Sequence, residues 1–313
     1  YSDTVFRSSA IFAEQIAPGN ATINVNGAID SLVNGVGVLA NTGAVIELNV
    51  DAEVRGSAGS FLRTEGAGQT TVNLNANAAI IGEQFVGLLA ASSGDTTLTL
   101  NGGGGSIQGA STGIVLETKN AAITVKDLAS LTAGDIALAG GYSRGVDAGL
   151  SARSSSGTIT IENIGTATSE LGFGIDADTR NSDGAGGFSG GGGDISIQNV
   201  SVQEIYDATT MTTSRSAGGI KAYSGTGAIN IGADAMVPNS AIGDIFTDGT
   251  GILAQSESGA ISIATLGDIT AGDQGIVATQ NGAGLLSITS DSAIDSFSNG
   301  ISATRTSAGD ISI

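Results

Sequence analysis

Residues 249–272, GTGILAQSESGAISIATLGDITAG, contain short apolar runs separated by glycine and small polar residues. In the Ile-Ser-Ile segment at 261–263, apolar and polar side chains alternate with the period of two that is typical of a β-strand. The overlapping segment 267–284, GDITAGDQGIVATQNGAG, repeats the Gly-Ile-x-Ala element of 251–254 at 275–278. The stretch therefore predicts short strands joined by tight corners, in a unit that recurs along the chain.

The alternating element recurs through almost the whole sequence, at intervals of 23, 26, 26, 25, 36, 36, 34, 32, 25 and 25 residues. Its copies begin at Thr22, Val45, Thr71, Thr97, Ala122, Thr158, Asp194, Ala228, Ala260, Leu285 and Asp310. The Gly-Ile-x-Ala-like element interleaves with it, at 37–40, 87–90, 113–116, 174–177, 219–222, 251–254, 275–278 and 300–303. A weaker apolar position lies between them, at Ile29, Val54, Ile81, Ile107, Leu131, Ile242, Ile269 and Ile294. Three short strands per unit predict an all-β parallel β-solenoid of about 11 coils.

The physics of stacking supports this architecture. Side chains alternate along a strand, so we expect Ile159 and Ile161 to point inward and Thr158 and Thr160 outward. One such strand buries too little apolar surface to fold alone, whereas equivalent strands stacked about 4.8 Å apart form a continuous apolar column. Corners need residues that tolerate positive φ, which accounts for many of the 50 glycines. No long segment shows the 3.6-residue period of a helix.

The outward neighbours of the alternating strand form a polar column. Its expected members are Asn24, Asn73, Thr99, Thr124, Thr160, Ser196, Asn230, Ser262, Ser287 and Ser312. A flat polar column fits ice binding or lateral strand contacts, but its ordinary interpretation is a soluble face with hydrogen bonds between coils. The drift from threonine to serine along the chain favours the ordinary interpretation.

Composition excludes several classes of function. The 313-residue chain carries a net charge of −19, so it repels nucleic-acid backbones and anionic membrane surfaces. No stretch is apolar enough to insert into a membrane. The chain has neither cysteine nor histidine, which excludes disulfides, the usual zinc sites and a Ser-His-Asp triad.

The repeat pattern also divides the chain. Residues 1–20 break the pattern and are predicted to form an N-terminal cap or the end of a preceding coil. Residues 21–313 are predicted to form continuous solenoid repeats, with longer loops at about 126–250. Because the sequence stops within a repeat, on GDISI, we expect the native chain to continue beyond it.

The combined pattern G-[IV]-x-A-x-[ST]-x-x-G-x-[IL]-x-I, clearest at 251–263, 275–288 and 300–313, resembles the passenger regions of Gram-negative autotransporters and filamentous-haemagglutinin-like adhesins. The resemblance covers nearly the whole chain from about residue 20. It implies a right-handed parallel β-helix secreted to the bacterial cell surface. It also implies a non-enzymatic adhesin that binds host or matrix protein, glycan or itself, although passengers on this scaffold include proteases and lipases.

Two alternatives remain open from the sequence. Many right-handed β-helices act on polysaccharides, but the Asn-Thr-Asp, Asp-Asp, Gly-His-Gly and Arg-Ile-Lys motifs of polygalacturonase-like enzymes are absent here. The best carboxylate pair is Asp176 and Asp178, which share the outward face of a strand and should lie beside Lys221 and Tyr223 of the next coil. That group is either an acid/base cluster or a solvated ion pair between coils, of which the second is favoured. The other alternative is a pure structural spacer or surface-layer component.

Calcium is the one cofactor that the sequence suggests. Asp244, Asp248, Asp268 and Asp273 lie at predicted corners, where their oxygens could bind the ion. Aspartate at a corner more often accepts hydrogen bonds from backbone amides, which favours a chain without cofactors.

The longer coils contain the predicted binding residues. Insertions in a solenoid emerge on its surface and often bind partners, and those at 140–157, 180–193 and 202–219 are rich in cationic and aromatic residues. Such side chains are favoured anchors for partners and sugars. The candidates are Tyr142, Arg144, Arg153, Arg180, Phe188, Tyr206, Arg215 and Tyr223. The alternative, which the sequence favours, is that these insertions are tolerated without a role.

Overall fold

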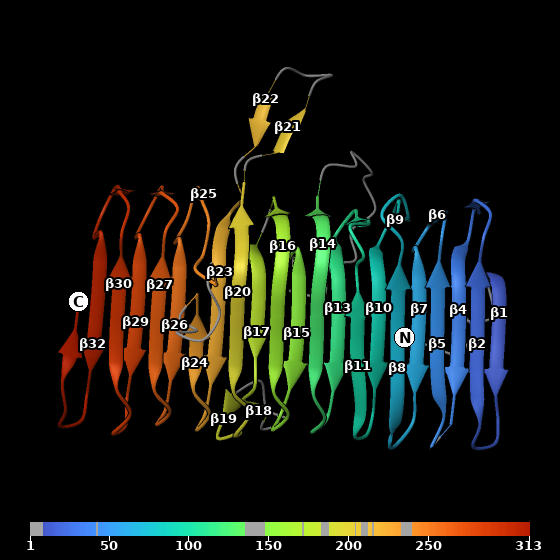
Figure 1. Ribbon diagram of the computed structural model, residues 1–313, viewed down its shortest axis with the longest axis horizontal. Helices are drawn as coiled ribbons and strands as arrows, with labels where there is room; N and C mark the ends of the chain where they lie inside the picture. Colours follow the sequence, from blue (N-terminus) through green and yellow to red (C-terminus); the bar gives the residue numbers. More distant parts are fainter. Residues whose placement is uncertain are drawn as a thin grey trace.

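The computed structural model describes residues 9–41, 43–134, 148–170, 172–182, 188–203, 205–207, 212–214, 216–232 and 240–313. Throughout these residues the regular elements are β-strands, stacked side by side in two large parallel sheets (Figure 1). This confirms the prediction of an all-β protein built from parallel strands in a solenoid-like stack. A search of the described residues finds no helix that is long and apolar enough to span a membrane.

The first sheet has 11 strands, each parallel to its neighbours. In spatial order they are β1 (Ser9–Gln15), β4 (Asn34–Ala40), β7 (Ser60–Thr64), β10 (Val86–Ser92), β13 (Thr112–Thr118), β15 (Leu150–Ser154), β17 (Phe173–Asp178), β23 (Gly218–Ser224), β26 (Ile252–Ser256), β29 (Ile276–Gln280) and β32 (Ile301–Arg305). Spatial order follows sequence order, so each strand pairs with the equivalent strand of the preceding and following repeats.

The second sheet has 18 strands arranged in two rows. The first row contains β2 (Asn20–Val25), β5 (Val45–Val50), β8 (Gly68–Leu74), β11 (Thr96–Asn101), β14 (Ile123–Ala133), β16 (Ile159–Ser169), β20 (Ile195–Val202), β24 (Ile229–Ile231), β27 (Ile261–Thr265), β30 (Leu286–Ser290) and β33 (Ile311–Ser312). The second row contains β3 (Ile29–Asp30), β6 (Glu53–Gly56), β9 (Ala79–Gly82), β12 (Ser106–Gly109), β25 (Ile245–Thr247), β28 (Ile269–Ala271) and β31 (Ile294–Ser296). The long strands β14, β16 and β20 run through both rows and join them.

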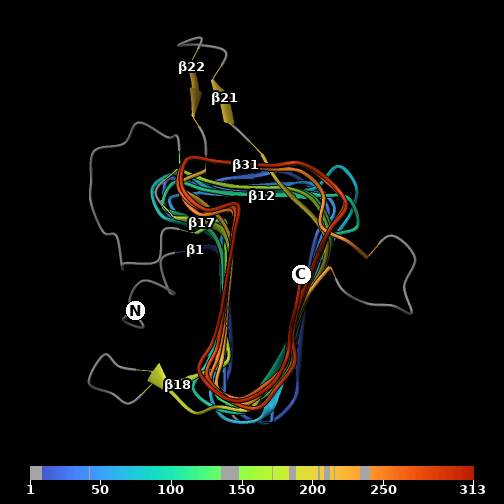
Figure 2. The ribbon, with the colours of Figure 1, turned by 90° about the vertical axis from the view of Figure 1, so that its left-hand side faces the viewer.

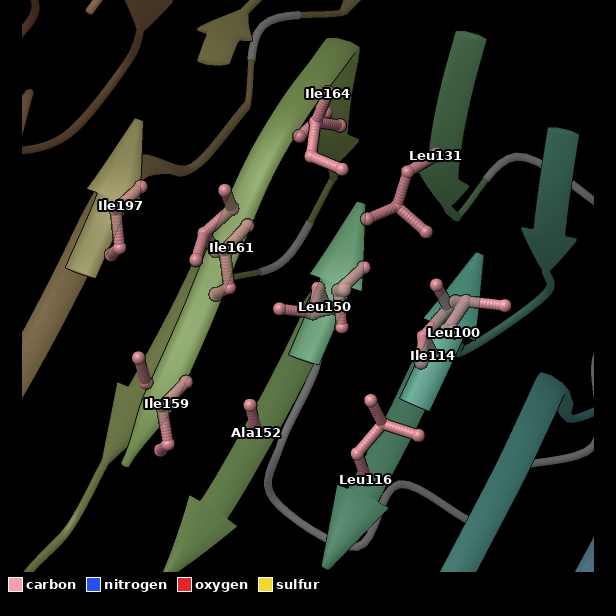
Figure 3. Close-up of a cluster of buried hydrophobic side chains, with 14 of the residues drawn as sticks. Leu100, Ile114, Leu116, Leu131, Leu150, Ala152, Ile159, Ile161, Ile164 and Ile197 are labelled. Carbon is pink, nitrogen blue, oxygen red and sulfur yellow. The ribbon is translucent and has the colours of Figure 1, made fainter. Parts of the chain in front are cut away.

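The three rows of strands enclose one core. Viewed along the stack, the 11-stranded sheet forms one long wall, and β12 and β31 lie across the top (Figure 2). Inward side chains from facing walls point toward one another, among them Leu150 and Ala152 of β15 and Ile159 and Ile161 of β16 (Figure 3). All four are fully buried members of the main apolar cluster. The predicted inward orientation of Ile159 and Ile161 is confirmed.

A column of glycines explains the first position of the Gly-Ile-x-Ala element. A Cβ atom on Gly251 would lie 2.6 Å from the carbonyl oxygen of Gly275 and 2.7 Å from Cγ2 of Ile269. Gly275 stands in the same relation to Gly300 and Ile294. Each glycine thus lets the chain pass close to the equivalent glycine of the next repeat and to the apolar residue of the second-row strand. The requirement at this position is close backbone approach, because neither glycine has a positive φ.

The bends within β14, β16 and β20 use a different residue type. Asp127, Asn163 and Asn199 adopt left-handed backbone conformations, with φ of 60°, 56° and 48°. Asparagine and aspartate tolerate this region better than other residues that have a side chain. Their side chains also form a ladder, since Asn163 Nδ2 donates to Asp127 Oδ1 at 2.8 Å and Asn199 Nδ2 to Asn163 Oδ1 at 2.9 Å. The ladder fixes the same bend in three successive repeats.

The structure corrects the predicted register at several positions. The Gly-Ile-x-Ala-like element predicted at 37–40 is displaced by two residues, to 35–38. Val36 and Val38 pair with Ser60 and Leu62 of β7. These two residues pair in turn with Leu88 and Ala90, the second and fourth positions of the element at 87–90. Ile80 and Ile245 occupy the second-row positions predicted for Ile81 and Ile242. The Gly-Val-Gly-Val-Leu-Ala segment at 35–40 allows a shift of two residues, and isoleucine occupies both 80 and 81 and both 242 and 245. The sequence alone therefore does not select the register at these positions.

The outward polar column is also corrected. Asn73 pairs with Asn101, whereas Thr99 pairs with Thr71. The resulting asparagine ladder is hydrogen bonded from side chain to side chain, with Nδ2–Oδ1 distances of 2.9 Å between Asn49 and Asn24, 2.8 Å between Asn73 and Asn49, and 2.7 Å between Asn101 and Asn73. The expected hydrogen bonds between repeats are therefore present in this part of the polar column.

Two antiparallel hairpins depart from the parallel stack. One is formed by β18 (Asn181–Ser182) and β19 (Phe188–Ser189), and the other by β21 (Ile205–Asp207) and β22 (Thr212–Ser214). Both emerge from the part of the chain where the repeats are longest, and β21–β22 projects from the top of the stack (Figure 2). At the N-terminus, β1 pairs with β4 as the edge strand of the first sheet, and residues 1–8 lie outside the described residues.

Candidate functional site

The candidate site lies on the outward face of the first sheet, over β15, β17 and β23. Asp176 pairs in register with Lys221, and Asp178 with Tyr223, as the sequence predicted. Their inward neighbours Ile175 and Ala177 are fully buried in the core. We call the outward group the charged cluster, and it consists of Arg153, Asp176, Asp178, Arg180, Lys221 and Tyr223.

The two carboxylates are buried, which corrects one prediction. Asp176 and Asp178 are each only 5% exposed, although they point away from the core. The predicted ion pair between coils is present, since Lys221 contacts Asp176 of the preceding repeat, but its description as solvated is wrong, because both carboxylates are buried. A buried pair differs from an exposed one in its energetics, since desolvation of both charges must be offset by their mutual contacts.

Asp176 is paired with two cations through one oxygen. Lys221 Nζ donates to Asp176 Oδ2 at 2.8 Å, while Arg153 Nη2 lies 3.9 Å from the same oxygen. The lysine ammonium also lies 5.4 Å from the centre of the Phe173 ring and 5.3 Å from that of Tyr223. The short contact and the two aromatic rings hold Lys221 in place, whereas Arg153 makes only the long contact to this carboxylate.

Asp178 holds Arg180 more tightly. Arg180 Nη2 donates to Asp178 Oδ2 at 2.7 Å and Nε to Oδ1 at 3.0 Å, the paired geometry typical of guanidinium and carboxylate. The backbone amide of Arg180 donates to Oδ1 as well, at 2.9 Å. The guanidinium carbon lies 4.2 Å from the centre of the Tyr223 ring, which completes a fixed stack of carboxylate, guanidinium and phenol.

Three polar atoms of the site are buried without a hydrogen-bond partner. They are Ser151 Oγ, Arg153 Nε and Asp176 Oδ1, which come from the neighbouring strands β15 and β17. Ser151 is the register partner of Asp176, so at least two of these atoms belong to adjacent residues. Buried polar groups normally have hydrogen-bond partners. Three of the six buried side-chain atoms that lack one in the described residues lie in this site.

Burial and charge shift two ionisation equilibria in the cluster. Desolvation raises the pKa of the Tyr223 phenol above its ordinary value of 10.0; nearby Arg180 opposes this shift, and Asp176 and Asp178 add to it. For Arg180, desolvation works against the charged form, but the hydrogen bond and charge of Asp178 raise its pKa above the ordinary value. Arg180 is therefore a permanent cation, and Tyr223 is a neutral phenol at physiological pH.

We predict that Tyr223 ionises above pH 10. The difference between the alkaline absorbance titrations of the wild type and Tyr223→Phe isolates this phenol, and its midpoint should exceed that of a free tyrosine. Since the folded-state pKa is raised, the contribution of Tyr223 to stability is complete below the unfolded-state pKa and is lost as pH rises through the folded-state pKa. A midpoint at or below that of free tyrosine would contradict the burial argument.

The contacts of the carboxylates bear on the enzymatic alternative. Both oxygens of Asp178 accept hydrogen bonds from Arg180, so neither is directed at a substrate. Asp176 Oδ2 is bound to Lys221, and Oδ1 is buried. A general acid or base must reach the proton that it transfers, and in this arrangement neither carboxylate presents an open oxygen. The geometry suits charge-assisted binding better than proton transfer.

The predicted binding residues divide into three groups. Arg153, Arg180 and Tyr223 come together in the charged cluster, through β15, the end of β17 and β23. Phe188 begins β19 and Tyr206 lies within β21, and only the backbone of these two residues is described. Tyr142, Arg144 and Arg215 lie outside the described residues.

The four aspartates suggested for calcium lie at two different corners of the repeat. Asp244 and Asp268 precede β25 and β28, while Asp248 and Asp273 follow these strands. Asp244 Oδ1 accepts from the amide of Asp268 at 3.0 Å, and Asp268 Oδ1 from that of Ala293 at 3.1 Å. These two carboxylates thus bind the backbone of the next repeat. Within the described residues, no group of three or more His, Cys, Asp or Glu is placed to hold a metal ion.

An open groove lies beside the charged cluster. Two of its lining residues, Glu117 and Lys119, were not predicted from the sequence. The groove has a volume of about 320 Å³ and crosses the ends of β10, β13, β15 and β17. It is lined by Ser92, Glu117, Thr118, Lys119, Arg153, Ser154, Ser155 and Arg180. Lys119 and Glu117 belong to a repeat of ordinary length, so attention to the long loops alone overlooked them. Alignment of the repeats could have found these residues, because Glu117 pairs in register with the predicted binding residue Arg153.

The chain matches no protein-family model, and comparisons with curated proteins and with solved structures find no match either.

Proposed function

We propose that the chain is a non-enzymatic binding region of an extracellular adhesin, displayed at a bacterial cell surface. In this proposal it is a right-handed parallel β-helix of about 11 coils with three short strands per coil. It attaches to host or matrix protein or glycan, or to another copy of itself, without a required cofactor. The stack supplies a stiff support, and binding is concentrated on the face that bears the charged cluster and the adjoining groove.

The single observation that carries the proposal is the concentration of cations on one part of an acidic chain. Lys119, Arg153, Arg180 and Lys221 are four of the 11 Lys and Arg residues of a chain with net charge −19. They converge from four successive strands of one sheet, next to an open groove. Arginine and aromatic side chains are enriched where proteins bind partners. A spacer without a ligand gives no reason for such a concentration.

The repeated architecture supports an attachment role. Parallel strands in register place equivalent surfaces at regular intervals, so weak contacts repeated along the rod add through effective concentration. The long insertions interrupt the middle repeats, which also contribute Arg153, Arg180 and Lys221 to the charged cluster. Surface loops held on a rigid scaffold are the usual carriers of binding function.

The proposal is tested by binding the purified chain to an array of glycans and extracellular-matrix proteins, with calcium and with a chelator. The matched variant replaces Arg153 and Tyr223 by glutamine and phenylalanine, and its fold is checked by β-type circular dichroism. We expect wild-type retention on a subset of spots and its loss in the variant.

Two outcomes would contradict the proposal. Absence of retention on every spot would favour a structural spacer. Disappearance of an arrayed glycan with time, abolished by Asp176→Asn, would instead establish a carboxylate-dependent polysaccharide lyase or hydrolase.

A further inference from the structure

We infer that the groove beside the charged cluster binds the acidic group of a saccharide, a carboxylate or a sulfate, through Arg153 and Lys119. The inference rests on the proposed binding function and specifies its ligand. It comes from the contrast between cations that are already held by carboxylates and cations that are available in the groove.

Arg180 is a fixed wall of the groove. Its guanidinium is bound by both oxygens of Asp178, stacks on Tyr223 and is 16% exposed. Lys221 lies outside the groove lining and is bound to Asp176 at 2.8 Å. These two cations are therefore largely neutralised by the two buried carboxylates, and they contribute shape and orientation to the site more than free charge.

Arg153 is the cation that a ligand can recruit. Its guanidinium is 33% exposed and lines the groove, and its nearest carboxylate oxygen, Asp176 Oδ2, is 3.9 Å away. That oxygen already accepts the short hydrogen bond from Lys221, and Arg153 Nε has no partner. Moving this side chain toward a ligand thus breaks no short hydrogen bond. A guanidinium can bind a carboxylate or sulfate through two parallel hydrogen bonds.

Lys119 lines the groove from the segment that follows β13. It is exposed, and no ion pair involves its ammonium in the described part of the chain. Since Asp178 compensates Arg180, the lining offers a ligand two cations, Lys119 and Arg153, against one lining carboxylate, that of Glu117. The local excess of positive charge favours an anionic ligand in spite of the acidic remainder of the chain, because exposed charges farther away than about 8 Å are screened at physiological salt.

The lining favours a saccharide over an acidic peptide. The other lining residues are Ser92, Thr118, Ser154 and Ser155, so the lining contains no apolar side chain. Peptide and protein partners are normally anchored by apolar or aromatic side chains in pockets, which this groove cannot offer. The hydroxyls of Ser92, Thr118 and Ser154 donate to the backbone carbonyl oxygens of Gly66, Gly94 and Ala121, so they give the groove a fixed polar wall. A polar wall of this kind suits a hydrated, polyhydroxylated ligand better than an apolar side chain.

The test is isothermal titration of the full chain with four probes: a uronic-acid trisaccharide, its carboxyl-reduced form, a sulfated neutral trisaccharide and a glutamate-rich hexapeptide. We expect one or both acidic trisaccharides to bind and the reduced form not to bind. Arg153→Gln should weaken binding by about tenfold, as expected for loss of a charge-assisted pair of hydrogen bonds. Lys119→Gln should weaken it several-fold.

The matched control is Lys126→Gln, which removes one cation from β14 on the other sheet and should leave affinity unchanged. Lys119 is exposed, so its variant separates a binding defect from a folding defect if Arg153→Gln lowers stability. Preference between the carboxylated and sulfated probes identifies the source of the acidic group.

The inference is overturned if the reduced trisaccharide binds as well as its acidic form, if the peptide binds better than both acidic sugars, or if Lys126→Gln is as damaging as Arg153→Gln. Failure of all four probes while the wild-type chain still binds spots of the array would reject the acidic saccharide and leave the adhesin proposal standing.

Discussion

Ile161→Ala is expected to lower the free energy of unfolding by about 2–5 kcal/mol, the range for truncating a fully buried large aliphatic side chain. Ile161 is 0% exposed and pairs in register with Val125 and Ile197, both also buried. The cavity would lie in the middle of the stack, where neighbouring strands on both sides keep the surrounding backbone from collapsing into it.

The matched control for this prediction is Thr160→Ala on the same strand. Thr160 points outward and is partly exposed, so its truncation should change stability by at most about 0.5 kcal/mol. Urea unfolding followed by circular dichroism measures both variants. Equal losses for Thr160→Ala and Ile161→Ala would show that the inward and outward faces of β16 are assigned wrongly.

The second large effect is expected in the charged cluster. Lys221→Met removes the cation that makes the short contact to Asp176, and it leaves a carboxylate that is 5% exposed with only the distant guanidinium of Arg153. Breaking a buried ion pair on one side typically costs about 3–5 kcal/mol, because the remaining charge stays desolvated. The partial exposure of Lys221 places our expectation at the lower end, about 3 kcal/mol.

A double-mutant cycle separates the ion pair from side-chain packing. Asp176→Asn alone should destabilise the chain, and adding it to Lys221→Met should recover part of the loss, since no buried carboxylate then lacks its cation. Urea unfolding of the four proteins gives the coupling free energy. Additive losses, with no coupling, would mean that the 2.8 Å contact contributes nothing to stability.

Much of the fold was predictable because the repeat restates the same information in each unit. The alternation at Ile159 and Ile161, the glycine before Ile252 and the polar corners each recur, so the strands, their parallel stacking and the inward face follow from the sequence. Register near the N-terminus did not follow. The segments around Val36 and Asn73 alternate over more positions than one pairing uses, and contacts between repeats select the alignment.

The sequence predicted which residues of the candidate site lie side by side, but not how deeply its carboxylates are buried or that Lys119 lines the adjoining groove. The pairing of Asp176 with Lys221 follows from aligning two Gly-Ile-x-Ala elements. The burial of the two carboxylates does not follow from this alignment, because a side chain that points outward from a strand is normally exposed to solvent. Nor does the role of Lys119, which reaches the groove from a repeat without a long insertion.

The sequence by itself determined the all-β class, the inward face of strands such as β16 and the juxtaposition of Asp176 with Lys221, because these depend on a local period and on one repeat following the next. Only the tertiary structure decided the register of the first repeats, the burial of the two aspartates and the difference between the held Arg180 and the available Arg153. These features depend on side-chain packing between residues that are far apart along the chain, and a repeat pattern leaves such contacts undetermined.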